Sequence, residues 1–287
     1  GSSVWLNENV PYNEETLQVL AEQYLASTFS APMGDEKTDK AIGEWINENT
    51  GNLLQDAAGE IQTKPETVML LLTTLYFKDQ WRDEFWAKET RQDVFTAANG
   101  AQQTVDFMHL TQDRASYCRG ENYTVAELRF QGGQAMRFLL PDEGVTLEDY
   151  LKNLTGEHLY QLITNHQYAD VQASIPRFTA QTELELEKAL TAMGITDLFD
   201  VSRADLRAMG SAPSGNNLYV SSVLHKTYLE LDENGTKAAA ATSVQVNGGS
   251  AQPTDVKTVT LDRPFLYMVV DTHACVPLFM GTVTSMK

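Results

Sequence analysis

ENGTKAAAATSVQVNGGSAQPT, residues 233–254, is the stretch that decides the fold of this chain. It holds four consecutive alanines followed by the polar run Asn247-Gly248-Gly249-Ser250, and it has no aromatic residue that could anchor it in a core. A stretch of about twenty residues without obvious structure is uncommon inside a compact domain, where it is usually a misassigned element or a functional loop. The stretch therefore needs its own explanation.

As a β-strand, this stretch would present two different faces, because successive side chains alternate. One face would be uncharged and would carry only small or β-branched side chains: Thr236, Ala238, Ala240, Thr242, Val244 and Val246. The other face would carry Lys237, Ala239, Ala241, Ser243, Gln245 and Asn247, so that the single charge could stay in water. Within this stretch no proline precedes Pro253, so each residue from Gly235 to Gln252 can donate a backbone hydrogen bond. The stretch can enter a sheet, yet it lacks the large apolar residues that would keep it there.

Three other interpretations of the same residues remain open on composition alone. Ala238–Ala241 could begin a short helix, since alanine is the best helix former. Asn247-Gly248 could form the tip of a β-hairpin, because this dipeptide suits a type I′ turn. The whole stretch could also be a flexible linker.

The flanking sequence predicts a mixture of strands and helices. Apolar, β-branched runs predict strands at Val68 to Phe77, Thr124 to Leu128, Gln134 to Leu140, Val171 to Phe178, Leu218 to Leu231, Lys257 to Leu261, Phe265 to Asp271 and Val276 to Thr284. Helical periodicity predicts helices at Glu14 to Phe29, Thr38 to Glu48, Leu147 to Leu154, Leu159 to Ile163 and Thr182 to Met193. Because the elements follow no regular βαβ rhythm, the pattern favours an α+β fold in a single domain over residues 1–287.

Composition excludes several classes of function. The formal net charge is −18 at pH 7, and an acidic surface repels nucleic acid. No apolar run is long enough to span a bilayer, and no basic cluster favours an anionic membrane. The two cysteines, Cys118 and Cys275, could form one bridge but lack the spacing of a metal site. No Gly-x-Ser-x-Gly elbow is present, so we expect neither an enzyme nor a metal or other cofactor.

Motifs on both sides of the stretch resemble one family. Glu233 to Thr242 is similar to the serpin hinge pattern E-x-G-T-x-A-A-A-A-T. Eight further blocks resemble serpin motifs in the right order: Trp45-Ile46-Asn47-Glu48-Asn49-Thr50-Gly51, Tyr76-Phe77-Lys78-Asp79-Gln80-Trp81, Phe138-Leu139-Leu140-Pro141-Asp142-Glu143, Ile175-Pro176-Arg177-Phe178, Gly194-Ile195-Thr196-Asp197-Leu198-Phe199, Ser222-Val223-Leu224-His225-Lys226, Asp262-Arg263-Pro264-Phe265-Leu266 and Pro277-Leu278-Phe279-Met280-Gly281. The resemblance covers the whole chain and is specific, because so many blocks follow one another.

The resemblance implies the serpin fold: a large central mixed sheet, further sheets, surrounding helices, and a reactive-centre loop at about residues 233–256 that is either exposed or inserted. It also implies suicide inhibition of a serine protease, in which the cut loop inserts into the central sheet and holds the protease as a covalent complex. The hinge residues would be Glu233, Gly235, Thr236, Ala238, Ala239, Ala240, Ala241 and Thr242. None of them would be catalytic.

Family spacing from Glu233 places the scissile bond at Gly249–Ser250, within a window from Val246 to Ala251. From Ala238 to Val256 there is no basic, aromatic, leucine or methionine residue. A trypsin-like pocket needs a cation and a chymotrypsin-like pocket a bulky apolar group. We therefore expect a partner protease with a small specificity pocket, of the elastase or subtilisin type.

Three residues outside the loop acquire roles only by the resemblance. His225 matches the shutter histidine beneath the point where the sheet opens, and Trp81 matches the tryptophan of the breach, where the loop first enters. Without the family, they would be a satisfied core histidine and a core aromatic. Thr73 stands where many members carry a shutter asparagine, and it offers fewer hydrogen bonds than an amide.

The resemblance begins at Gly1-Ser2-Ser3-Val4-Trp5-Leu6, so the four helices and one strand that precede this strand in the family are absent. We therefore expect a monomeric, N-terminally truncated serpin domain, extracellular or at the cell surface. The sequon Asn234-Gly235-Thr236 favours a bacterial source, because a glycan there would block insertion. The alternatives are a non-inhibitory serpin and an inactive truncated fragment.

Overall fold

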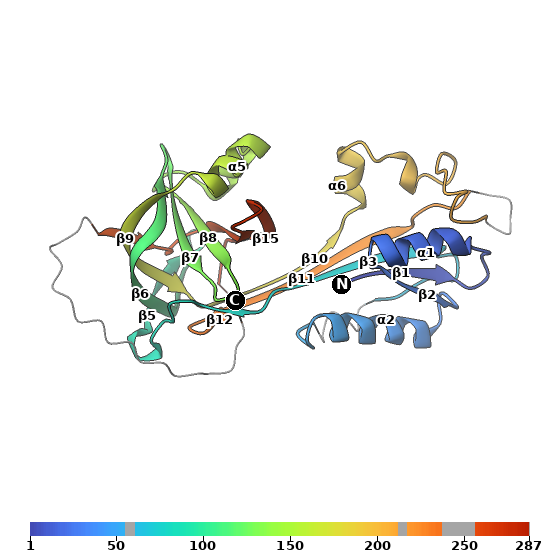
Figure 1. Ribbon diagram of the computed structural model, residues 1–287, viewed down its shortest axis with the longest axis horizontal. Coiled ribbons are helices and arrows are strands. Elements are labelled where there is room, and N and C mark those ends of the chain that lie inside the picture. Colours follow the sequence, from blue (N-terminus) through green and yellow to red (C-terminus); the bar gives the residue numbers. More distant parts are fainter. Residues whose placement is uncertain (55–60, 212–216, 237–255, 287) are drawn as a thin grey trace. The chain divides into compact units, whose positions relative to one another are not determined.

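The computed structural model of the chain describes residues 1–54, 61–211, 217–236 and 256–286. Its contacts divide the chain into two compact units, Gly1–Tyr76 with Gln181–Tyr228 and Phe77–Ala180 with Leu229–Lys287 (Figure 1). We describe each unit by itself. The expectation of one domain over residues 1–287 stays a prediction.

The first unit contains a sheet with helices on both of its faces. Its strands are β1 (Ser2–Asn7), β2 (Ser27–Ala31), β3 (Met69–Tyr76) and the first part of β11 (Ser222–Asp232), in the order β2-β1-β3-β11, and β10 (Phe178–Glu185) also pairs with β11. Its helices are α1 (Glu14–Gln23), α2 (Glu36–Asn49), α6 (Glu187–Ala192) and the 3-10 turn Asp197–Phe199. Strands β3 and β11 are parallel neighbours over seven residue pairs, from Leu70 with Ser222 to Tyr76 with Tyr228.

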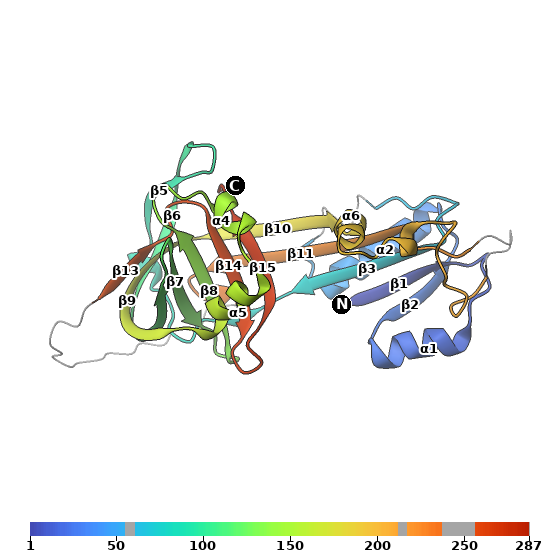
Figure 2. The ribbon, with the colours of Figure 1, turned by 90° about the horizontal axis from the view of Figure 1, so that it is seen from above.

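Alternation along the strands separates the two cores of this sheet. On one face, Leu70 and Leu72 of β3 pack with Ile42, Trp45 and Ile46 of α2. On the other face, Met69 packs with Leu17 and Leu20 of α1 and with Leu190 of α6. Helix α2 therefore covers one face while α1 and α6 cover the other, as Figure 2 also shows.

The second unit is built on a sheet in which every recognised pair is antiparallel except that of β13 with β9, which is parallel. Its strands are β5 (Arg91–Thr96), β6 (Gln102–Arg119), β7 (Tyr123–Arg129), β8 (Gln134–Pro141), β9 (Gln167–Pro176), β13 (Lys257–Thr260), β14 (Phe265–Asp271) and β15 (Val276–Val283), in the order β13-β9-β6-β7-β8-β14-β15 with β5 on β6. The 18-residue strand β6 changes partners along its length, with an irregularity between Gln112 and Ala115 where Arg114 has a φ of 52°. Helices α4 (Leu147–Lys152) and α5 (Gly156–Thr164) cover one face, and the 3-10 turn Ala87–Glu89 precedes β5.

Two predicted helices are wrong in part. Helix α1 ends at Gln23, Leu25 takes a φ of 52°, and Phe29 lies in β2, where its ring stacks on Trp5 with centroids 4.2 Å apart. The predicted helix from Thr182 to Met193 begins as strand β10, and only Glu187–Ala192 is α-helical. In both places pairing with a neighbouring strand outweighs the local periodicity, which sequence alone does not reveal.

The other predicted strands and helices agree with the structure within a few residues, and the α+β class is confirmed. Strands β5 and β6 lie where the sequence analysis predicted no element. Both cysteines are free thiols in the structure. Burial raises the pKa of Cys118, which leaves this thiol protonated at neutral pH. Among the described residues, no helix combines the length and apolarity that crossing a membrane requires.

Candidate functional site: the breach cluster and the shutter pair

In the second unit, the start of the hinge is already part of a sheet. Gly235 and Thr236 form the two-residue strand β12, which pairs antiparallel with Leu231 and Asp232 at the end of β11. On its other side, β12 pairs antiparallel with β4 (Asp79–Gln80). The hinge therefore enters the strand order between β11 and β4.

The side chain of Thr236 fastens this short strand. Thr236 is fully buried, its Oγ1 accepts a hydrogen bond from the backbone N–H of Asp79 at 2.8 Å, and it donates one to the Asp79 carbonyl at 3.2 Å. Gly235 has a φ of 130°, and a Cβ there would lie 2.3 Å from the Asp79 carbonyl oxygen. Only glycine fits this position, both because of its backbone conformation and because of the close approach of β4.

Glu233, the residue that opens the hinge, is a buried carboxylate with two partners. Arg177 reaches it from the end of β9 and donates from Nε to both carboxylate oxygens, at 3.0 and 2.9 Å, and Thr90 donates from Oγ1. Burial alone would raise the pKa of Glu233, but the hydrogen bonds from Arg177 and Thr90 outweigh it and hold this pKa below its ordinary value. Glu233 therefore stays ionised and ties the start of the hinge to Arg177 at the end of β9 and to Thr90 before β5.

Trp81 packs against the turn that leads from β11 into the hinge. It is fully buried, its indole Nε1 donates to the carbonyl of Asp232 at 2.9 Å, and its backbone N–H donates to the carbonyl of Asn234 at 2.9 Å. Its ring stacks on Phe130 with centroids 4.5 Å apart and an interplanar angle of 6°. We call Trp81, Asp79, Arg177, Glu233, Gly235 and Thr236 the breach cluster.

In the first unit, Thr73 of β3 and His225 of β11 are direct partners across the parallel ladder. Thr73 Oγ1 and His225 Nδ1 are 2.7 Å apart, and Thr73 Oγ1 also lies 3.5 Å from the Leu224 carbonyl oxygen. Burial lowers the pKa of His225, so the imidazole is neutral at pH 7. We call Thr73 and His225 the shutter pair. It links β3 and β11, which pair directly with each other.

The structure thus brings four predicted site residues together in the breach cluster (Trp81, Glu233, Gly235 and Thr236) and two in the shutter pair. The predicted hinge residues Ala238, Ala239, Ala240, Ala241 and Thr242, and the predicted scissile bond Gly249–Ser250, lie outside the described residues. Their roles stay predictions. Within the described ranges, no group of three or more His, Cys, Asp or Glu side chains is placed to hold a metal ion.

Sequence reasoning missed the partners of the hinge. Arg177 was part of a recognised block but received no role, although one cation beside apolar strand residues often marks a buried pair. Asp79 contacts Thr236 through its backbone, which leaves no signal in the side-chain pattern. Lys226, next to the shutter histidine, is fully buried and pairs with Glu183 Oε2 at 2.6 Å.

Comparisons with known proteins agree with this geometry. The family model described as "Serpin (serine protease inhibitor)" matches residues 1–286. Human serpin B11 is 29% identical over 97% of this chain and 71% of its own length, and human leukocyte elastase inhibitor is 28% identical over 96% and 76%. The solved native structure of tengpin, a thermophilic serpin, is 33% identical, with a TM-score of 0.91 over all of this chain and 73% of tengpin.

The chain is shorter than these relatives, and it spans 66% of the length of two others. The match nevertheless extends over practically every residue of the chain, and it includes the hinge, the breach and the shutter motifs. The chain belongs to the serpin family of serine protease inhibitors.

Proposed function

We propose that this protein inhibits a serine protease by a suicide mechanism in which its cleaved reactive-centre loop inserts into the central sheet. The protease serine attacks the carbonyl carbon before the scissile bond, within residues 246–251. An ester bond forms, the peptide bond breaks, and the new amino group leaves with the proton that the serine gave up. The loop, now free at one end, inserts as a strand and carries the acylated protease with it before water can cleave the ester.

One observation carries this proposal: Gly235 and Thr236, near the start of the hinge, are already paired on both sides, with β11 and with β4. Continuing this strand requires β3 and β11 to separate, and they now pair directly with each other. The hydrogen bond of the shutter pair would then break. It contributes only about 1 kcal/mol, so it slows the opening without preventing it.

The gain from insertion exceeds this cost. A new strand between two others forms hydrogen bonds on both edges, and each contributes about 1 kcal/mol net. Ten or more inserted residues would therefore release roughly ten kcal/mol. The native state is then metastable, and a kinetic barrier protects it.

The target follows from the residues around the expected bond, which are small or valine. A protease with a narrow specificity pocket accepts such residues, and we propose an elastase-like or subtilisin-like enzyme. The name of leukocyte elastase inhibitor, one of the relatives, is in keeping with this class. Such a target also suits the proposed extracellular or cell-surface location and a monomeric inhibitor.

The test compares two alanines that differ only in the face on which they would insert. Ala240→Arg would place a charge on the face shared with Thr236, whereas Ala239→Arg would place it on the opposite face. Parent and variants are incubated with an elastase-like and a subtilisin-like protease, and complexes that survive boiling in detergent are measured. We expect the parent and Ala239→Arg to form them and Ala240→Arg to be cleaved as an ordinary substrate.

Two results would contradict the proposal. If Ala240→Arg traps the protease as well as its parent does, the inserting face is assigned wrongly. If the parent forms no complex and its melting temperature does not rise after the loop is cut, the chain is a non-inhibitory serpin or an inactive fragment, because insertion would add a strand and raise the stability.

A further inference from the structure

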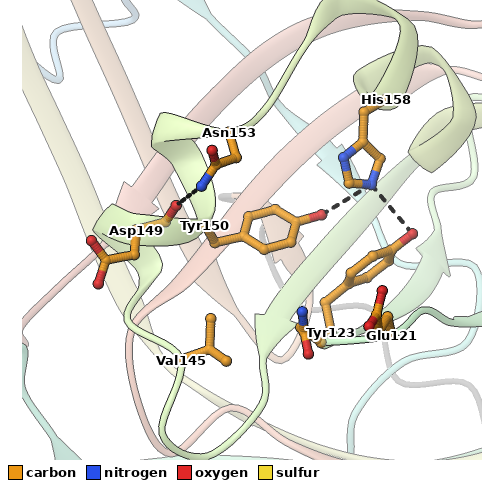
Figure 3. Close-up of a pocket in the computed structure, with 8 residues that line it drawn as sticks. Glu121, Tyr123, Val145, Asp149, Tyr150, Asn153 and His158 are labelled. Atoms are coloured by element: carbon orange, nitrogen blue, oxygen red, sulfur yellow. Dashed lines mark hydrogen bonds between the residues drawn. The ribbon is translucent and has the colours of Figure 1, made fainter.

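The second unit contains a pocket that the inhibitory mechanism does not use. It has a volume of about 310 Å³ and lies between the turn that joins β6 to β7 and the helices α4 and α5. Its lining consists of Glu121, Asn122, Tyr123, Val145, Asp149, Tyr150, Asn153 and His158 (Figure 3). This volume is at the lower end of the range for small-molecule sites, so the occupant would be small.

Three aromatic rings form one wall of this pocket. The ring centroids of Tyr123 and Tyr150 are 5.4 Å apart, and the His158 ring lies 5.5 Å from Tyr123 and 5.8 Å from Tyr150. The backbone N–H of His158 donates to the N-cap side chain of Thr155, which fixes the main chain from which the imidazole projects. The rings therefore form a packed, preorganised group.

Both tyrosine hydroxyls point toward the same nitrogen, His158 Nε2, at 3.3 and 3.4 Å, as Figure 3 shows. An imidazole nitrogen makes one in-plane hydrogen bond, so it cannot satisfy both hydroxyls fully. Burial raises the pKa of Tyr150 and that of Tyr123 above the ordinary value of a phenol. Both phenols are thus neutral, and their ring faces carry the negative quadrupole that attracts cations.

The charges around the pocket have one sign. Glu121 and Asp149 line it, and no lysine or arginine does. The carboxylate of Asp149 already has two partners: Lys152 Nζ lies 3.4 Å from it, and Thr146 Oγ1 donates a hydrogen bond to it. No hydrogen bond or ion pair of the Glu121 side chain is recorded among the described residues, so this carboxylate is available to a ligand.

The rest of the pocket lining indicates which kind of cation would fit. Val145 contributes an apolar side chain. A bare metal ion would need several carboxylate or imidazole ligands together, and the described part of the chain has no such group. Aromatic faces, an apolar contact and one free carboxylate together suit a cation whose charge is surrounded by methyl groups.

We propose that this pocket binds a small quaternary ammonium group, with the ring faces of Tyr123 and Tyr150 and the carboxylate of Glu121 as its partners. The ligand carries this group either free, as in choline, or attached to a phosphate, as in a lipid head group. The acidic rim repels a phosphate, so the free cation binds more tightly. None of the residues that line this pocket belongs to the predicted reactive-centre loop.

The test titrates choline into the 287-residue protein and follows the aromatic proton resonances of tyrosine and histidine by NMR. The matched control ligand is 3,3-dimethyl-1-butanol, which has the shape of choline without its charge. We expect choline to bind at least about tenfold more tightly than this alcohol. Phosphocholine is titrated in parallel. Whether choline or phosphocholine binds with the higher affinity shows whether the pocket recognises the quaternary ammonium group free or attached to a phosphate. Equal binding of choline and the alcohol, or no saturable binding of choline, overturns the proposal.

Variants locate the binding. Tyr150→Phe keeps the ring face and should retain affinity within about twofold, whereas Tyr150→Leu should weaken choline binding about tenfold. Glu121→Gln, at an exposed position, should weaken it about threefold, and Glu8→Gln in the first unit should have no effect. Should Tyr150→Leu fail to fold, Glu121→Gln decides, since unchanged choline affinity in that variant places the cation elsewhere.

Discussion

Replacing Glu233 by glutamine tests how firmly the start of the hinge is held by Arg177 and Thr90. Glutamine keeps the size of the side chain but removes the charge that Arg177 and Thr90 bind. Breaking a fully buried ion pair costs about 3–5 kcal/mol, and an exposed pair contributes about 0–1 kcal/mol. The Glu233 side chain is 8% exposed and that of Arg177 43%, so we expect an intermediate cost of about 2 kcal/mol.

Two backbone hydrogen bonds report this loss locally. The N–H of Phe85 donates to the Glu233 carbonyl and that of Trp81 to the Asn234 carbonyl. If these amides exchange through local opening, a cost of about 2 kcal/mol should speed their hydrogen exchange about 30-fold in Glu233→Gln. Amides of β14, such as that of Met268, should be unaffected and serve as the control.

A double-mutant cycle separates the ion pair from other effects of the substitution. Arg177→Gln alone should cost less, because this side chain is partly in water and also meets Asp106 at 3.4 Å. The two substitutions together should cost less than their sum by about 1–2 kcal/mol. Additive costs, or unchanged exchange at Phe85, would refute the conclusion that the pair anchors the hinge. The pKa of Glu233 is lowered in the fold, so the stability that its carboxylate contributes is present above the ordinary pKa of about 4.5. This contribution declines as the pH falls through the pKa of Glu233 in the folded state. We therefore expect Glu233→Gln to lose this pH dependence of stability.

Three further substitutions test the breach cluster and the shutter pair. Gly235→Ala should lower the free energy of unfolding in urea by at least about 2 kcal/mol, because the new Cβ would meet the Asp79 carbonyl oxygen. The control Gly100→Ala, where a Cβ would have nothing within 4 Å, should lower it by about 1 kcal/mol. Equal losses would contradict the close approach of β4. Trp81→Phe should lower stability by about 1–3 kcal/mol, since the Asp232 carbonyl loses its buried donor, and an unchanged urea midpoint would show that this bond contributes nothing. The pKa of His225 is lowered in the fold, so the folded state disfavours protonation of this residue, and stability should fall as the pH drops below the ordinary value of about 6.5. We expect His225→Gln to show a smaller loss in melting temperature between pH 8 and pH 5.5 than the parent. An identical loss in parent and variant would show that the shutter pair does not cause this pH dependence.

Much of the fold follows from sequence because its strands are dense apolar runs and its helix α2 has a regular apolar stripe. The errors occur where that signal is ambiguous. Phe29 satisfies a helical spacing from Glu14 as well as the inner face of a strand, and only pairing with β1 decides between them. Thr182 begins a segment with helical spacing that is held as strand β10 by its pairing with β11.

Site residues could be predicted from sequence where their side chains belong to a motif. They could not be predicted where the contact is made by backbone groups. Gly235 and Thr236 stand in the hinge motif, and Trp81 stands in its own block. In contrast, Asp79 is involved through its N–H and carbonyl groups, which every residue possesses. Arg177 and Glu233 are 56 positions apart in the chain, and no local pattern links residues at such a distance.

The existing pairing of β12 has a consequence for the length of the loop. Thr236 is opposite Leu231 on one side and Asp79 on the other, so the phase of any strand that continues from it is already set. If the loop inserts as we propose, every second residue after Thr236 would share its buried side, and deleting one alanine of the run would move the later residues to the opposite side. A deletion of two residues would keep this alternation, whereas a deletion of one would turn polar side chains such as Gln245 toward the core.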